Sequence, residues 1–129
     1  MQFEDLQNFL HVRPGELFGG GDDAVTTPFL IDGAEPLVIN VRHMPGGLFM
    51  VHDDARTTKR HPALADLWLS DGWADYRKAQ EDAGVQMDEE GRIFAIARDN
   101  ADIARAVARV AETAIGLDCA ARVSGAADA

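Results

Sequence analysis

The sequence predicts a single α+β domain, in which a small antiparallel sheet with a central hairpin packs against a long C-terminal helix. Two observations lead to this fold class. Residues 37–53 form two β-rich arms around a Pro-Gly-Gly turn, and the order of predicted elements is helix, strands, helices, hairpin, helix. A chain of 129 residues is long enough for one core and too short for two, so we assign residues 1–122 to one domain and 123–129 to a frayed tail.

The N-terminal part predicts a short helix followed by an edge strand. Phe3, Leu6 and Leu10 recur at helical spacing, which indicates a helix over residues 3–11. A β-rich run over residues 25–31 follows. Pro28 within this run favours an edge position, because proline cannot donate a ladder hydrogen bond.

The hairpin over residues 37–53 is the strongest local signal. A three-residue loop, Pro45-Gly46-Gly47, pairs residue 43 with 49 and residue 41 with 51, whereas a two-residue loop would mix apolar and polar side chains on both faces. The three-residue loop is therefore preferred. One face then carries Ile39, Val41, Phe49 and Val51, and the other carries Asn40, Arg42, Met50 and His52.

The second half predicts three helices and a second hairpin. Apolar spacing favours a helix over residues 62–69, a second helix over residues 73–83 ends at Gly84, and helical spacing favours core positions for Trp68 and Trp73. Residues 85–87 and 92–97 form the two arms of a hairpin around an acidic turn. A closing helix runs from Asn100, the predicted N-cap, to about Leu117, and Cys119 is expected to be a small apolar filler on it.

Charge limits the classes of partner. The formal net charge is −10, which repels phosphate backbones and disfavours direct nucleic-acid binding, whereas a basic protein partner is favoured. Carboxylates along a ridge can imitate a phosphate backbone and occupy the basic groove of a nucleic-acid-binding protein. Ordinary acidic solubility is the alternative reading. The candidate partner-binding residues are Asp22, Asp23, Asp88, Glu89 and Glu90.

The positive charges fall unevenly. Residues 37–62 carry four bases against two acids, while the segments before and after them are acidic. These bases indicate either a solvated edge or a weak anion-binding patch. The candidate anion-binding residues are Arg42, Arg56, Lys59 and Arg60.

His52, Asp53 and Asp54 are the alternative to a purely interacting protein. Together with His43 or His61 they have the ligand types of a metal-dependent hydrolase, in which a metal-bound water acts as the nucleophile. The hairpin register places His43 and His52 on opposite faces, which favours instead a solvated strand end where Asp53 or Asp54 caps the next turn. No phosphate-binding loop or calcium loop is complete, so we expect no cofactor.

The expected location is the cytoplasm. A single cysteine cannot form an internal disulfide, which fits a reducing compartment. The N-terminal residues lack the features of a secretion signal, and no apolar run approaches the roughly 20 residues that span a bilayer. The oligomeric state does not follow from the sequence.

Short motifs resemble a known family. The segment from Ala24 to Phe29, the strand end Val51-His52-Asp53-Asp54, and the later segments 84–88 and 92–94 resemble a bacterial and phage family known as the domain of unknown function number eighteen twenty-eight. The resemblance covers about residues 16–117. It implies occurrence in prophages and mobile elements, and it carries no catalytic set.

The sequence and the resemblance together favour a non-enzymatic acidic interaction module. We expect a phage or mobile-element inhibitor of a basic nucleic-acid-handling host complex, acting in anti-defence by nucleic-acid mimicry. The metal-dependent hydrolase is the alternative.

Overall fold

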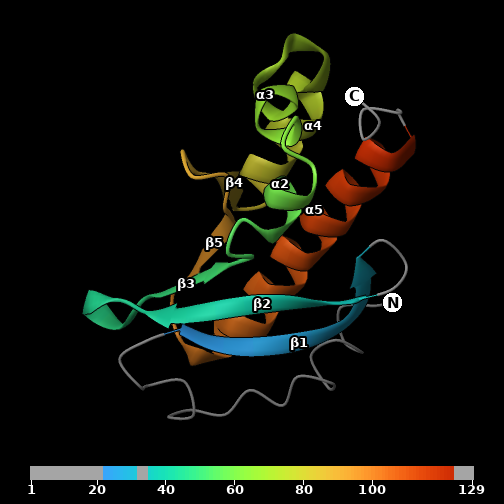
Figure 1. Ribbon diagram of the computed structural model, residues 1–129. Coiled ribbons are helices and arrows are strands. Elements are labelled where there is room, and N and C mark those ends of the chain that lie inside the picture. The colour runs from blue at the N-terminus through green and yellow to red at the C-terminus, as the bar shows by residue number, and fades with distance from the viewer. Residues whose placement is uncertain (1–21, 32–34, 124–129) are drawn as a thin grey trace.

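The computed structural model describes residues 22–31 and 35–123 (Figure 1). The strands are β1 (Asp22–Ile31), β2 (Glu35–His43), β3 (Phe49–His52), β4 (Val85–Met87) and β5 (Ile93–Ala97). The α-helices are α2 (Arg56–Arg60), α3 (Leu64–Leu69), α4 (Ala74–Asp82) and α5 (Ile103–Val123), and the short 3-10 turns are η1 (Pro45–Gly47), η2 (Asp71–Trp73) and η3 (Asn100–Asp102). The predicted helix over residues 3–11 and most of the predicted tail, residues 124–129, lie outside the described residues.

The five strands form one antiparallel sheet in the order β1-β2-β3-β5-β4. This confirms the predicted α+β fold, including the long C-terminal helix against the sheet. β1 lies at an edge, as Pro28 predicts, and its pairing with β2 is irregular between Thr26 and Leu30.

The central hairpin has the predicted register. Val41 pairs with Val51 and His43 with Phe49, and the Met44 N–H donates to the Leu48 carbonyl at 2.8 Å across the three-residue loop. Two glycines make this loop possible. Gly46 and Gly47 have φ of 83° and 78°, the left-handed region that other residues enter only with strain.

The core lies between α5 and one face of the sheet. The predicted apolar face is confirmed: Ile39, Val41 and Val51 are 0% exposed and Phe49 is 2% exposed. The apolar residues of α5 recur at helical spacing and pack against this face to form the hydrophobic core of the described residues.

The second face of β3 differs from the expected solvated strand. Met50 is 9% exposed and His52 is 0% exposed, so all four residues of β3 are buried. β3 is the central strand of five, with pairing partners on both sides.

The helical part was predicted in outline. The expected helices over residues 62–69 and 73–83 correspond to α3 and α4, and the second hairpin pairs Met87 with Ile93. The five-residue helix α2 was not predicted. It begins directly after the chain leaves β3 and Ala55 adopts φ 59°.

Two details of α5 differ from expectation. The capping side chain is Asp99, which accepts from the Asp102 N–H, one residue before the predicted cap Asn100. Cys119 is exposed and is not a core filler, because the buried stripe of α5 passes through Leu117 and Ala121 on another side of the helix.

Candidate functional site

Asp53 organises the corner between β3 and α2. Its side chain is 0% exposed, and Oδ1 accepts the N–H groups of Ala55 and Ile93, each at 2.9 Å. Oδ2 accepts the Thr57 N–H at 3.2 Å. Burial raises the pKa of Asp53 above its ordinary value, although three backbone N–H donors oppose that rise. Asp53 thus caps the turn into α2, as the sequence analysis expected of Asp53 or Asp54. The expected strand end was solvated, however, and Asp53 is buried.

The other residues of the predicted metal cluster lie in different environments and do not converge on one point. His52 Nδ1 accepts the Asp54 N–H at 3.0 Å, and the Asp54 side chain is exposed. His43 lies at the far end of β2 with its ring 5.3 Å from that of Phe49. His61 is buried and bonds to Asp118. Within the described ranges, no group of three or more His, Cys, Asp or Glu side chains has the geometry of a metal site.

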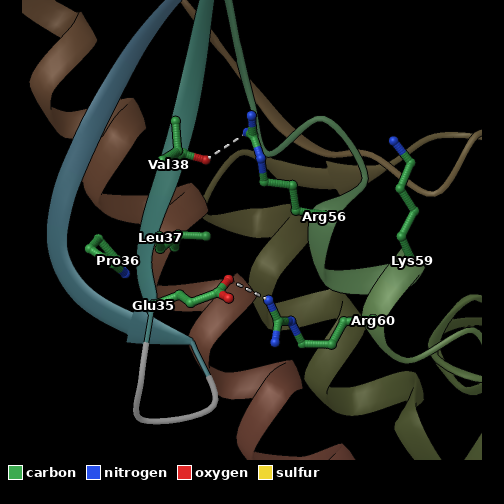
Figure 2. A pocket seen from close by; sticks show the side chains of 7 residues that line it. All are labelled: Glu35, Pro36, Leu37, Val38, Arg56, Lys59 and Arg60. Carbon is green, nitrogen blue, oxygen red and sulfur yellow. Dashed lines mark hydrogen bonds and ion pairs between the residues drawn. The ribbon is translucent and has the colours of Figure 1, made fainter.

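Three of the four predicted anion-binding bases line one pocket. α2 presents Arg56, Lys59 and Arg60 on one side because residues at i, i+3 and i+4 share a helical face. Figure 2 shows this pocket between α2 and the start of β2. Its volume is about 330 Å³. The lining residues are Glu35, Pro36, Leu37, Val38, Arg56, Lys59 and Arg60. The fourth base, Arg42, lies further along β2 and does not line the pocket.

The three cations do not converge on a single point. Arg56 Nη1 donates to the Val38 carbonyl at 3.1 Å and to Asn40 Oδ1 at 3.2 Å, and Arg60 Nη2 bonds to Glu35 Oε2 at 2.9 Å (Figure 2). Lys59 extends away from both guanidinium groups. Lys59 is exposed, its backbone N–H donates to the Ala55 carbonyl at 2.9 Å, and in the described part of the chain its ammonium group makes no ion pair or hydrogen bond. The pocket therefore contains the ammonium group of Lys59, which has no hydrogen-bond partner in the described residues, and two guanidinium groups that are hydrogen-bonded to other groups of the protein.

The predicted partner-binding acids lie at two separate places. Asp22 and Asp23 are the first residues of β1, at one edge of the sheet. In the strand register, Asp22 lies opposite Arg42 of β2. Residues 88–90 form the turn between β5 and the opposite edge strand β4. Strands β2 and β3 separate the two places, so the five predicted acids do not form one continuous ridge.

Asp88 has a structural role in its turn. Its Oδ1 accepts the N–H groups of Glu90 and Arg92, each at 2.9 Å, and Oδ2 bonds to Arg92 Nε at 2.7 Å. Burial raises the pKa of Asp88, but the hydrogen bonds and charge of Arg92 outweigh it and the net pKa is lowered. Glu89 and Glu90 are exposed on the same turn.

A wider acidic surface was not predicted from the sequence. Residues 64–90 carry eight acids against two bases, a net charge of −6. We call the exposed carboxylates of these residues the acidic segment, and they are Asp66, Asp71, Asp75, Glu81, Asp82, Glu89 and Glu90. In Figure 1, α3 and α4 lie at the opposite end of the molecule from β1 and β2. A sequence signal existed, because five of the nine residues of α4 are charged.

Comparison with known proteins yields no relative. No protein-family model, curated protein or solved structure matches this chain. None of the helices in the described part of the chain combines the length and apolarity needed to cross a membrane.

Proposed function

We propose that this protein is a non-enzymatic interaction module whose acidic segment binds a basic, nucleic-acid-handling partner. The observation that carries the proposal is that five of the seven carboxylates of the acidic segment have no ion pair in the described part of the chain, whereas Asp82 pairs with Lys78 and Glu90 lies 3.5 Å from Arg92. Over residues 22–31 and 35–123, no cation lies within ion-pairing distance of Asp66, Asp71, Asp75, Glu81 or Glu89.

Several other described carboxylates are paired. Asp102 bonds to Arg105, Glu112 lies 3.8 Å from Arg109, and Glu35 bonds to Arg60. A paired carboxylate has little charge left to offer a partner, whereas unpaired exposed carboxylates project their field into solvent. Such a field raises the rate of encounter with a cationic surface and falls with ionic strength.

If the carboxylates of the acidic segment imitate phosphate groups, the partner is a nucleic-acid-binding protein. Nucleic-acid-binding proteins present Lys and Arg to phosphate oxygens, and a carboxylate accepts the same charge-assisted hydrogen bonds. The resemblance to the family of unknown function number eighteen twenty-eight supports a phage or mobile-element setting. In that setting, the proposed partner is a host defence complex that the protein inhibits.

A pull-down with matched variants tests this proposal. The triple variant Asp71→Asn, Asp75→Asn, Glu81→Gln removes three charges from the acidic segment. The control Glu35→Gln, Asp54→Asn, Glu112→Gln removes three exposed charges elsewhere. We expect the wild type and the control to recover a basic nucleic-acid-binding protein from host lysate at low salt, and the acidic-segment variant to recover much less. Recovery of no basic protein at low salt, or equal recovery by both triple variants, would contradict the proposal.

A further inference from the structure

A small apolar groove adjoins the acidic segment. It lies between η2, the start of α4 and the C-terminal half of α5, and has a volume of about 260 Å³. The lining residues are Gly72, Trp73, Tyr76, Gly116 and Ala120. Pockets for drug-sized ligands usually exceed about 300 Å³, so this groove suits one side chain better than a whole small molecule.

Aromatic packing fixes one wall of the groove. The Tyr76 ring lies edge-on to Trp73, with centroids 5.6 Å apart, and edge-on to Trp68 at 6.3 Å. Trp68 is 3% exposed, so Tyr76 is fixed against the core, whereas Trp73 is only partly buried and remains accessible from the groove. Thr113 Oγ1 donates to Gln80 Oε1 at 2.8 Å and holds α4 against α5 next to this wall.

The opposite wall depends on a glycine. A Cβ atom at Gly116 would lie 2.8 Å from the Tyr76 hydroxyl oxygen, closer than real Cβ contacts allow. Glycine in the middle of a helix costs roughly 0.5–1 kcal/mol relative to alanine. At this position it lets α5 approach the Tyr76 side chain closely.

The charges beside the groove select its occupant. Asp71 precedes the groove residue Gly72, and Asp75 lies between Trp73 and Tyr76 in the sequence; both are exposed and belong to the acidic segment. On α5 the nearby cation Arg122 lies 3.1 Å from the buried carboxylate of Asp118, which balances its charge. Of the cations of α4, Arg77 donates to the Trp68 carbonyl and Lys78 pairs with Asp82 at 3.2 Å, so the exposed charges beside this apolar groove that have no ion pair within the described residues are the carboxylates of Asp71 and Asp75.

From this charge complementarity we propose that the groove binds one apolar side chain of a cationic partner segment while the flanking carboxylates bind its Lys or Arg residues. This inference rests on the proposed function and deepens it, because it adds an apolar anchor to an electrostatic surface. A buried anchor gives specificity that exposed charges alone do not supply.

Two synthetic peptides test the anchor. The first is a 12-residue peptide of Lys and Gly only, and the second is identical except for a central Leu. Burial of one leucine side chain corresponds to roughly tenfold or more in affinity. We expect both peptides to bind at low salt, the leucine peptide about tenfold more tightly, and only the leucine peptide to shift the tryptophan emission. This shift should disappear in Trp73→Phe.

Filling the groove provides the matched comparison. Ala120→Leu places a side chain in the groove, and Ala101→Leu places the same side chain at an exposed position of η3. The two peptides should bind Ala120→Leu with equal affinity, whereas the leucine peptide should still bind Ala101→Leu about tenfold more tightly than the peptide of Lys and Gly. Equal binding of the two peptides to the wild type would overturn the groove inference and leave the proposed function standing. Failure of both peptides to bind would overturn both.

Discussion

His61 and Asp118 are 57 residues apart in the sequence, and their side chains meet in the core, with Nε2 2.8 Å from Oδ1. His61 is 8% exposed and Asp118 is 0% exposed. The contact joins the end of α2 to α5, and so connects the corner after the central hairpin to the helix that covers the sheet. An ionised carboxylate only accepts hydrogen bonds, so His61 Nε2 is the donor.

Removing this donor should destabilise the protein. His61→Ala leaves a buried carboxylate with one bond fewer, and we expect the free energy of unfolding to fall by about 2–4 kcal/mol. Urea denaturation at pH 7 measures the change. Lys59→Ala, an exposed change on α2, is the control and should cost less than about 0.5 kcal/mol. A loss below 1 kcal/mol in His61→Ala would show that the contact contributes little.

Asp53 should be more sensitive to truncation than to an isosteric change. Asp53→Asn keeps an oxygen for Ala55 and Ile93 and loses the bond from Thr57, which should cost about 1–2 kcal/mol. Asp53→Ala leaves three buried N–H groups without their acceptor and should cost roughly 3 kcal/mol or more. Equal effects of the two substitutions in urea denaturation would refute this account of the corner.

The raised pKa of Asp53 predicts a pH dependence of stability. Between the ordinary pKa of 3.8 and the raised pKa of the folded state, the folded protein keeps a proton on Asp53 that the unfolded chain has already lost. The stability contributed by this proton is complete below 3.8 and is lost as pH rises through the folded pKa. The stability of the wild type relative to Asp53→Asn should therefore decline as pH rises from about 4. A constant difference across pH 4–8 in urea denaturation would contradict the raised pKa.

The pocket beside α2 should bind small anions weakly through Lys59. Sulfate should raise the melting temperature of the wild type more than that of Lys59→Ala at matched ionic strength. The comparison between variants matters, because sulfate stabilises folded proteins generally by exclusion from their surface. Equal shifts in both proteins would show that the pocket does not bind the anion.

The metal-hydrolase alternative has a simple test. If His52, Asp53 and Asp54 bound Zn or Mn, adding either ion or a chelator would change the melting temperature, because a ligand that binds only the folded state stabilises it. We expect no change, since the oxygens of Asp53 already accept three backbone N–H groups. Near-stoichiometric metal in protein purified without a His-tag would instead support the hydrolase.

The register of the hairpin was predictable because strand side chains alternate with a period of two. Of the two loop lengths compared, only the three-residue loop places Ile39 and Val51 on the same face, and the structure has that register. α2 was not predictable in this way, because its sequence, Arg-Thr-Thr-Lys-Arg, has no apolar stripe. Contacts that are distant in sequence, such as Thr58 Oγ1 donating to the Gly91 carbonyl at 2.9 Å, help to hold it in place.

The candidate surfaces were only partly predictable. The concentration of bases in residues 37–62 was sufficient to indicate Arg56, Lys59 and Arg60 as candidates, but their common face on α2 and the wall formed by β2 required the fold. The sequence analysis predicted Asp22, Asp23 and residues 88–90 as partner-binding acids because these acids are adjacent in the sequence. The unpaired carboxylates of α3 and α4 are dispersed along the sequence and were not predicted. Which of them have no ion pair in the described part of the chain depends on the fold: Asp82 pairs with Lys78, whereas Asp66, Asp75 and Glu81 have no such partner.

Displacement of nucleic acid from the basic partner tests the central claim most directly. A fluorescently labelled duplex bound to the partner recovered in the pull-down is titrated with wild-type protein at low and high salt. We predict that the wild type and the control triple variant displace the duplex at low salt, that the acidic-segment variant needs at least about tenfold more protein, and that high salt weakens displacement for all three. No displacement by the wild type at low salt, or equal displacement by the acidic-segment variant, would contradict the account.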